Sequence, residues 1–168
     1  NQEAAIACCW TGRQLSSEDV QYLHGLPLTL ISEDFTMVHG SPREPIWEYV
    51  ISTSSAGDNI AYFKTKFCLV GHSHVPLVFE FLNESGTCLY RQLPDGAELS
   101  LGEHRLIINP GGVGQPRDGD PRASYAVYDS EAGVIHHYRV SYDIAATQER
   151  MVKQRLPRRL AARLSHGW

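Results

Sequence analysis

Two short apolar segments end in a histidine beside a glycine, and this pattern restricts the fold more than any other feature. The segment FTMV, residues 35–38, is followed by His39, and the segment FCLV, residues 67–70, is followed by Gly71 and His72. Apolar runs without polar alternation are typical of strands that are covered on both faces of a sheet. We therefore predict a layered α/β fold in which these histidines directly follow buried strands.

Length and composition fit a single folded domain. The chain has 168 residues, of which 42% are hydrophobic and 20% charged, so we treat residues 1–168 as one domain. The net charge of −4 gives no sign of nucleic-acid binding beyond a nucleotide substrate. No apolar run is long enough to span a membrane. The four cysteines lack C-x-x-C spacing, so we expect free thiols and a cytoplasmic protein.

The remaining pattern alternates helices with strands, and strands predominate in the second half. Helices are predicted at residues 2–14, after an N-terminal cap at Ser17, and from about residue 143 onward with a break before Pro157. The turn sequences PDG and EAG predict two hairpins. Strands are predicted at residues 28–31, 35–38, 67–70, 75–81, 87–92, 98–101, 105–109, 123–128 and 134–140.

A third histidine strengthens the pattern of the two apolar segments. His74 lies two residues after His72 in the sequence GHSH, and a turn after Gly71 can bring both side chains to one site. Ligands of α/β proteins bind at the carboxyl ends of strands, and neutral imidazole is the commonest metal ligand. We therefore predict that His39, His72 and His74 ligate metal; ordinary hydrogen-bonded histidines are the alternative.

Three longer segments carry a family resemblance. VHGSP, VGHSHVP and INPGGVGQPRDGDPRASYAVYD occur in this order, and together they resemble the C-terminal part of a calcineurin-like metallophosphoesterase. Small bacterial members of the phosphodiesterase type are the most similar. The resemblance implies a two-sheet β-sandwich flanked by helices and hydrolysis of a phosphodiester or phosphomonoester at a two-metal centre. It also implies two divalent ions, which could be Mn, Fe, Ni, Co or Zn.

The resemblance assigns the three histidines to particular ions. It implies that His39 and His72 ligate the second metal and that His74 ligates the first. The family's other motifs, D-x-H, G-D-x-x-D and G-N-H-D, do not occur in residues 1–168. Those motifs supply the bridging carboxylate, further ligands and a histidine that is proposed to protonate the leaving group.

This departure leads us to expect a C-terminal portion of a longer protein. The catalytic residues would then lie outside residues 1–168, and the 168-residue chain alone would have little activity. We expect either association with its own N-terminal segment or a homo-oligomer. Asp58, Asp118 and Asp120 are weaker candidates for carboxylate ligands within the sequence.

A glycine-rich loop and nearby arginines are candidates for substrate binding. Glycines in NPGGVGQPRDGDPR permit close approach to an anion, and arginine pairs with phosphate oxygens. We select Arg43, Asn109 and Arg117 as substrate-binding candidates, and Arg122 is a further possibility. Alternatively, the loop is structural and its arginines pair with nearby aspartates. Gly112 stands where the family usually has a serine.

The C-terminal segment from residue 149 is basic. It carries six arginines and lysines against a single glutamate. Basic helices can bind nucleic acid or acidic lipid, but the apolar residues between the charges favour a helix packed on the domain with a solvated basic face.

Three functional hypotheses follow. We favour a metal-dependent phosphoesterase. The alternatives are a catalytically inactive binding or regulatory module of the same fold and a single-metal enzyme of the cupin type, which also uses H-x-H between strands.

Overall fold

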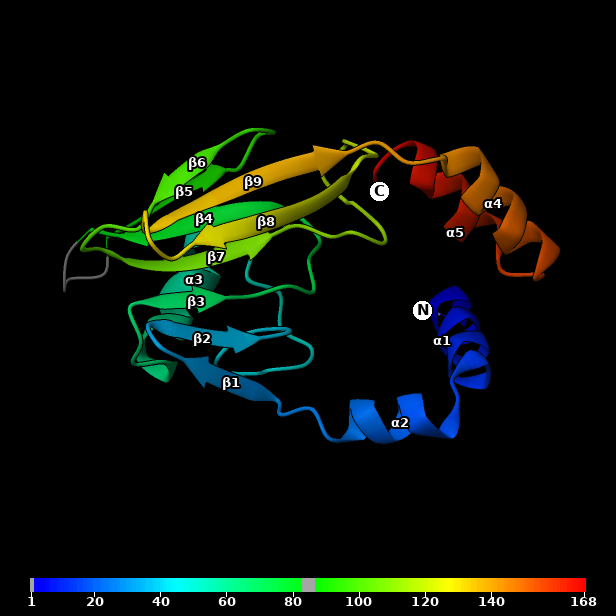
Figure 1. Ribbon diagram of the computed structural model, residues 1–168, viewed down its shortest axis with the longest axis horizontal. Coiled ribbons are helices and arrows are strands. Elements are labelled where there is room, and N and C mark those ends of the chain that lie inside the picture. Colours follow the sequence, from blue (N-terminus) through cyan, green and yellow to red (C-terminus); the bar gives the residue numbers. More distant parts are fainter. Residues whose placement is uncertain (1, 83–86) are drawn as a thin grey trace.

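The computed structural model describes residues 2–82 and 87–168, and within them it contains two β-sheets flanked by helices (Figure 1). The larger sheet has the order β1-β2-β3-β7-β4-β5, and the smaller has the order β6-β9-β8. This arrangement confirms the predicted fold class. The strands are β1 (Thr29–Ser32), β2 (Phe35–Val38), β3 (Phe67–Leu69), β4 (Pro76–Phe81), β5 (Cys88–Gln92), β6 (Glu98–Ser100), β7 (Arg105–Pro110), β8 (Ala123–Asp129) and β9 (Val134–Val140).

Helices occupy both ends of the chain and one position between the strands. They are α1 (Gln2–Gln14), α2 (Ser17–His24), α3 (Thr53–Asn59), α4 (Ile144–Lys153) and α5 (Arg158–Ala162), with 3-10 turns η1 (Ile60–Tyr62) and η2 (Arg163–Ser165). The cap of α2 is Ser16, one residue before the predicted Ser17. Ser16 and Asp19 form a reciprocal capping box, which the adjacent serine at position 17 does not form.

The centre of the larger sheet explains where the histidines lie. Strand β2 pairs with β3 and β3 pairs with β7, both in parallel. The carboxyl ends of parallel strands meet at one edge of a sheet. Strand β4 runs antiparallel to β7 and begins at this same edge, where Pro76 lies opposite Pro110. His39, His72 and His74 therefore all leave the sheet from a single edge.

The larger sheet separates two hydrophobic cores. On one face Val38, Cys68 and Ile107 pack in a cluster that includes Ala56 of α3. Alternate residues of the same strands point to the opposite face, toward the smaller sheet. That second core contains Phe35, Phe67, Val78, Leu93, Leu99, Leu106, Ile108 and Ile135. Because β2, β3 and β7 are covered on both faces, they have the unbroken apolar sequences from which strands were predicted.

One of the two predicted hairpins is confirmed, and the other is wrong. The EAG turn joins β8 to β9, which pair antiparallel. The PDG turn instead leads from β5 in the larger sheet to β6 in the smaller one. Leu93 is buried at this crossing, and Gly96 N–H donates to the His137 carbonyl at 3.0 Å. The turn residues were recognised correctly, but burial and cross-sheet bonds decide which strand follows them.

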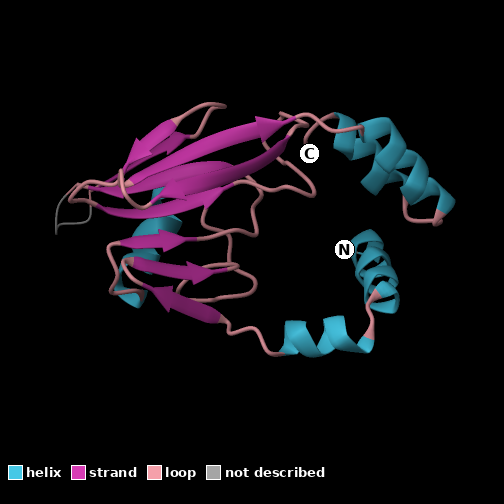
Figure 2. Cartoon of the chain, viewed as in Figure 1, coloured by secondary structure: helices cyan, strands magenta, loops and turns pink. Residues whose placement is uncertain are grey.

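The terminal helices contribute little to either core. None of the residues of α1, α2 or α4 is buried, and Figure 2 shows α1 and α2 extending away from the sheets. The expectation of a packed C-terminal helix therefore holds only for its last part, where Ala161 and Leu164 are buried. Within the described ranges, no helix is both long and apolar enough to cross a bilayer. All four cysteines lie in those ranges and are free.

Two glycines of the loop after β7 allow a matched test of how closely this loop packs against β8. Both Gly111 and Gly119 have positive φ angles, +86° and +88°. A Cβ at Gly111 would lie 2.3 Å from the Ser124 hydroxyl, which is also in hydrogen-bond contact with His137 at 2.8 Å; a Cβ at Gly119 would meet nothing within 4 Å.

We expect Gly111→Ala to lower the free energy of unfolding by roughly 3 kcal/mol, because it adds a steric clash to backbone strain. Gly119→Ala should cost only about 1 kcal/mol, from the strain alone. Urea denaturation of both variants measures the difference. Equal losses would show that the contact with Ser124 does not constrain the loop.

Candidate metal and phosphate site

Two of the predicted ligands meet directly at the sheet edge. His39 Nε2 and His72 Nδ1 lie 3.0 Å apart, and the two ring centroids are separated by 4.8 Å. The backbone fixes this arrangement, because Gly71 N–H donates to the His39 carbonyl at 2.9 Å. The parallel pairing of β2 with β3 thus continues past the last strand residues and brings the two imidazoles together.

The GHSH turn has an unusual backbone conformation. His72 and His74 have φ angles of +58° and +60°, a left-handed region that residues with a Cβ seldom occupy. The buried Asn109 amide supports this turn, donating to the Gly71 carbonyl at 2.7 Å and to the Ser73 hydroxyl at 2.9 Å. Such strain persists where surrounding contacts over-determine it, and it is concentrated at functional sites.

Asn109 was expected on the substrate side, but its polar atoms are used within the protein. Its side-chain oxygen accepts a hydrogen bond from Gly111 N–H at 2.9 Å, and the residue is only 1% exposed. Together with its two donated bonds, this joins the turn that carries the histidines to the loop after β7. Asn109 therefore fixes the position of the GHSH turn relative to the loop after β7.

His74 is held in a single tautomer. Its Nδ1 lies 2.6 Å from the Gln115 carbonyl oxygen, which can only accept, so Nδ1 carries the proton. The Nε2 lone pair is left for another partner, as in many metal-ligating histidines. A Cβ at Gly112 would lie 3.0 Å from the His74 Cβ and Cγ atoms. Glycine at position 112 thus permits the loop to close over this ring.

The surroundings favour neutral imidazoles. Burial, and then the nearby His39, lower the pKa of His72, although a hydrogen bond to the main chain of Trp47 partly offsets the shift. Burial also lowers the pKa of His74, against the opposing effect of its bond to Gln115. A lowered histidine pKa keeps the ring unprotonated, and hence able to ligate, at neutral pH.

The Tyr49 ring packs against His72, and a polar network surrounds the neighbouring residue Glu48. The Tyr49 ring stacks on the His72 imidazole with centroids 4.1 Å apart and an interplanar angle of 17°. The neighbouring Glu48 carboxylate accepts hydrogen bonds from Arg43, Ser41 and Asn59. These bonds, that from Arg43 above all, lower the pKa of Glu48 to about 2. Sequence reasoning missed Tyr49 and Glu48, because no periodic pattern distinguishes them in an irregular segment.

Arg43 belongs to this network. Its guanidinium pairs with Glu48 and lies 3.4 Å from an Asp58 carboxylate oxygen. We had selected Arg43 as a substrate-binding candidate, but two carboxylates already balance its charge. Arg43 therefore contributes to the site indirectly. It binds Glu48, whose neighbour in the sequence, Tyr49, stacks on His72.

The carboxylates considered as metal ligands are also engaged. Asp58 pairs with Arg43, Asp118 with Arg139, and Asp120 with Arg122 at 2.7 Å. Arg122 also pairs with Asp95 at 2.7 Å. Across residues 2–82 and 87–168, no group of three or more histidine, cysteine, aspartate or glutamate side chains is arranged to hold a metal ion.

Arg117 differs from the other arginines of the loop. Its Nη2 donates to the Gln115 side-chain oxygen at 3.1 Å, and its main-chain N–H donates to the His74 carbonyl at 3.4 Å. Its Nε is buried without a hydrogen-bond partner, and no described carboxylate pairs with it. Arg117 is therefore the one substrate-binding candidate whose charge is not balanced by a described carboxylate.

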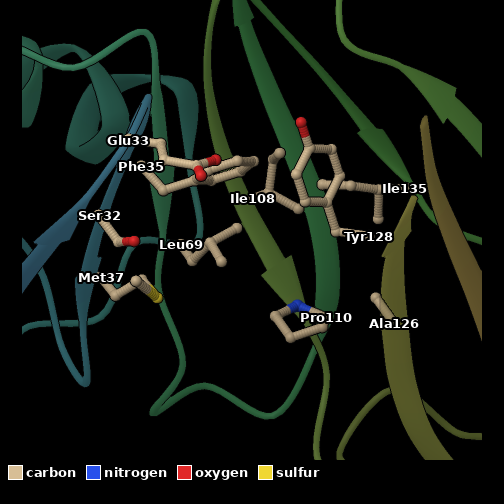
Figure 3. A pocket seen from close by; sticks show the side chains of 10 residues that line it. All are labelled: Ser32, Glu33, Phe35, Met37, Leu69, Ile108, Pro110, Ala126, Tyr128 and Ile135. Carbon is tan, nitrogen blue, oxygen red and sulfur yellow. The ribbon is translucent and has the colours of Figure 1, made fainter. Parts of the chain in front are cut away.

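An apolar groove lies apart from the histidines, between the two sheets (Figure 3). Its volume is about 380 Å³. None of the predicted site residues lines it. The lining residues are Ser32, Glu33, Phe35, Met37, Leu69, Ile108, Pro110, Ala126, Tyr128 and Ile135. The groove extends the second core rather than forming part of the polar site.

Paired imidazoles at the carboxyl edge of a two-sheet fold agree with the family to which this chain belongs. Residues 11–133 match the calcineurin-like phosphoesterase superfamily domain. The chain is a member of this superfamily, whose activity is phosphoester hydrolysis and whose members bind divalent metal.

Particular relatives support the assignment. The uncharacterized protein MJ0912 of Methanocaldococcus jannaschii is 38% identical over 173 residues, which cover 99% of this chain and 67% of that protein. The crystal structure of a metallophosphoesterase from Sphaerobacter thermophilus superposes with a TM-score of 0.90 at 46% identity, covering 95% of this chain and 65% of the other.

A more distant structure shows the same fold. The hypothetical protein PH1004 from Pyrococcus horikoshii OT3 has a TM-score of 0.69 at 22% identity, and the match covers 93% of this chain and 57% of that one. The chain thus spans about two thirds or less of the lengths of these three proteins.

The Glu48 network can be tested by an isosteric change. We expect Glu48→Gln to lower the free energy of unfolding at pH 7 by roughly 2 kcal/mol, because it removes charge-assisted hydrogen bonds and leaves Arg43 underpaired. The control is Glu103→Gln, which removes an ion pair between Lys66 and a carboxylate that is 95% exposed. The control should change stability by less than about 0.5 kcal/mol.

The pH dependence of this difference has a defined sign. The pKa of Glu48 is about 2, below its ordinary value of 4.5, so its stabilisation is present above pH 4.5 and is lost as the pH falls through 2. Urea titrations of wild type and Glu48→Gln should therefore converge toward pH 2. A constant gap across this range would contradict the proposed ionic network.

Proposed function

We propose that this protein hydrolyses a phosphodiester or a phosphomonoester at a two-metal centre. In this proposal His39 and His72 ligate one divalent ion and His74 ligates the other. The observation that carries it is the 3.0 Å approach of His39 Nε2 to His72 Nδ1 at the edge of the larger sheet, in a member of the calcineurin-like superfamily. A cupin-type enzyme is excluded by this fold and family.

In this proposal two imidazoles share one ion. His39 Nε2 and His72 Nδ1, which lie 3.0 Å apart in hydrogen-bond contact, are the two nitrogens that would hold a shared ion. The tautomer of His74 leaves its Nε2 available. Imidazole is a suitable ligand for Mn, Fe, Ni, Co and Zn, so the choice among these ions rests with the remaining ligands.

The chain's own residues have separate tasks in this mechanism. Divalent ions, when bound, would stabilise negative charge on the phosphoryl oxygens. His39 and His72 are oriented by the sheet edge, and Tyr49 restricts rotation of the His72 ring. Burial lowers the pKa of His72 and of His74, which favours the neutral form of both rings. Arg117 is the candidate to pair with substrate phosphate oxygens.

We further propose that the carboxylate ligands come from polypeptide outside residues 1–168. Two observations support this: Asp58, Asp118 and Asp120 are each paired with an arginine, and the relatives are longer than this chain. A preceding segment of the same polypeptide is the favoured source, and a second copy of the chain is the alternative.

Activity measurements on the intact gene product test the proposal. With added Mn²⁺ it should hydrolyse a generic aryl phosphodiester or monoester, and a chelator should abolish turnover. His72→Ala should lower kcat/KM by roughly 100-fold or more, with loss of bound metal. His104→Ala is the matched control, because that exposed histidine pairs with Glu80 on the far end of β4 and should leave turnover unchanged.

Residues 1–168 alone should show little turnover, since three imidazoles do not offset the repulsion of two close divalent ions. Full activity of residues 1–168 would contradict the external source of the carboxylates. An intact protein that binds two metals but hydrolyses no phosphoester would instead be a binding or regulatory module.

A further inference from the structure

The smaller sheet contains a buried pair of polar side chains that lies outside the histidine site. Ser124 of β8 is 2% exposed, and His137 of β9 is fully buried. The Ser124 hydroxyl lies 2.8 Å from His137 Nε2, and His137 Nδ1 lies 2.9 Å from the Pro94 carbonyl oxygen. The same hydroxyl lies 2.6 Å from the Pro110 carbonyl oxygen at the end of β7. Because buried polar groups require hydrogen-bond partners, the protons along these three contacts can be counted.

A neutral His137 does not satisfy all three contacts. A carbonyl oxygen only accepts, so Pro94 and Pro110 each require a donated proton. If the single imidazole proton is on Nδ1, the one hydroxyl proton of Ser124 must serve both Nε2 and the Pro110 oxygen. If it is on Nε2, the Nδ1 lone pair faces the Pro94 oxygen at 2.9 Å, and two acceptors oppose each other. With a proton on both ring nitrogens, every contact has one donor and one acceptor.

Charged side chains beside this ring balance a positive charge. Among the described residues, ion pairs join two arginines to three carboxylates in one network: Arg122, Arg139, Asp95, Asp118 and Asp120. The network therefore has one carboxylate in excess. Asp95 directly follows Pro94, and its carboxylate accepts from the Arg139 N–H at 2.9 Å, two residues after His137 on β9. The pKa of Asp95 is lowered by this bond first, then by Arg122, and most weakly by the charge of His137.

Ser124 connects the buried pair to the loop that covers His74. Its hydroxyl donates to the Pro110 carbonyl, and its N–H donates to the Gly112 carbonyl at 3.1 Å. Gly112 lies against the His74 ring, since a Cβ at this glycine would be 3.0 Å from the His74 Cβ and Cγ atoms. Further along the loop, the Gln115 carbonyl accepts from His74 Nδ1. A hydroxyl proton shared between two acceptors would hold the start of this loop less firmly than one donated to Pro110 alone.

We propose that His137 is a positioning residue that carries a proton on both ring nitrogens and, through Ser124, holds the loop after β7 against His74. The protonation of His137 follows from the contacts alone, whereas its value for catalysis rests on the proposed phosphoesterase function. The inference gives a role to a buried imidazole that the proposed mechanism does not use.

Nitrogen-15 NMR of the imidazole rings in the metal-free intact gene product tests the protonation directly. At neutral pH both ring nitrogens of His137 should show a directly bonded proton. In Ser124→Ala the Nε2 proton should be lost, because the ring then needs only the bond to Pro94. His136→Gln is the matched control, since that side chain points to the opposite face of β9, 3.5 Å from Glu98, and should leave the His137 signals unchanged. A single ring proton in the wild type, or two in Ser124→Ala, would overturn the inference.

The His74 ring provides the readout for positioning. Its Nδ1 proton, which is bonded to the Gln115 carbonyl, should exchange with solvent about tenfold faster in Ser124→Ala and in His137→Gln, as expected from the loss of one buried hydrogen bond. His136→Gln should keep the wild-type rate. If His137→Gln does not fold, the smaller change Ser124→Ala decides alone. A lowered melting temperature with unchanged His74 exchange would show a merely structural role and contradict the positioning.

The outcomes separate this inference from the proposed function. If His137 has two ring protons and the His74 exchange rate depends on Ser124, the positioning holds even where the Mn²⁺-loaded protein hydrolyses no phosphoester. If hydrolysis occurs with wild-type kcat and KM in Ser124→Ala, and His74 exchange is also unchanged, the inference fails and the proposed function stands.

Discussion

A single buried amide holds together the parts of the molecule that carry its chemistry. Asn109 donates to the GHSH turn at two points and accepts from Gly111 in the loop after β7. Only an amide can do this, because the turn presents acceptors while Gly111 presents a donor. An aspartate at this position would lack both donated bonds, and a leucine would leave three buried polar groups unsatisfied. Because the turn carries two histidines and the loop carries Arg117, their mutual placement depends on this side chain.

The sequence predicted the parts of the site that follow from regular structure. Apolar runs located β2 and β3, and parallel pairing then required His39 and His72 to meet. It did not predict Tyr49 stacking on His72, because residues 41–50 have no regular backbone and depend on the long-range partner Asn59. The hairpin predicted at the PDG turn is wrong for a related reason. The residues of PDG specify a turn, but they do not specify with which strand the next segment pairs.

Charge pairing distinguishes the structural arginines from Arg117, and two of these pairs join residues that are far apart in the sequence. Arg122 reaches Asp95, and Arg139 reaches Asp118, across 27 and 21 residues of sequence. From the sequence we selected Arg117 and kept Arg122 as a further possibility, although both lie in one glycine-rich loop. The fold pairs Arg122 with two carboxylates and leaves Arg117 beside His74. Asp120 is only two residues from Arg122, whereas the pairing with Asp95 depends on tertiary structure.

The conformation of the GHSH turn indicates that its histidines serve a purpose other than stability. Each positive φ angle at a residue with a Cβ costs on the order of 1–3 kcal/mol, and His72 and His74 both have one. Glycine at either position would relieve that strain without disturbing the bonds of Asn109, which contact Gly71, Ser73 and Gly111. Histidines in these two positions therefore carry a backbone strain that glycine would not. Burial lowers the pKa of both imidazoles, and a neutral imidazole at a sheet edge is what the proposed metal-binding function needs.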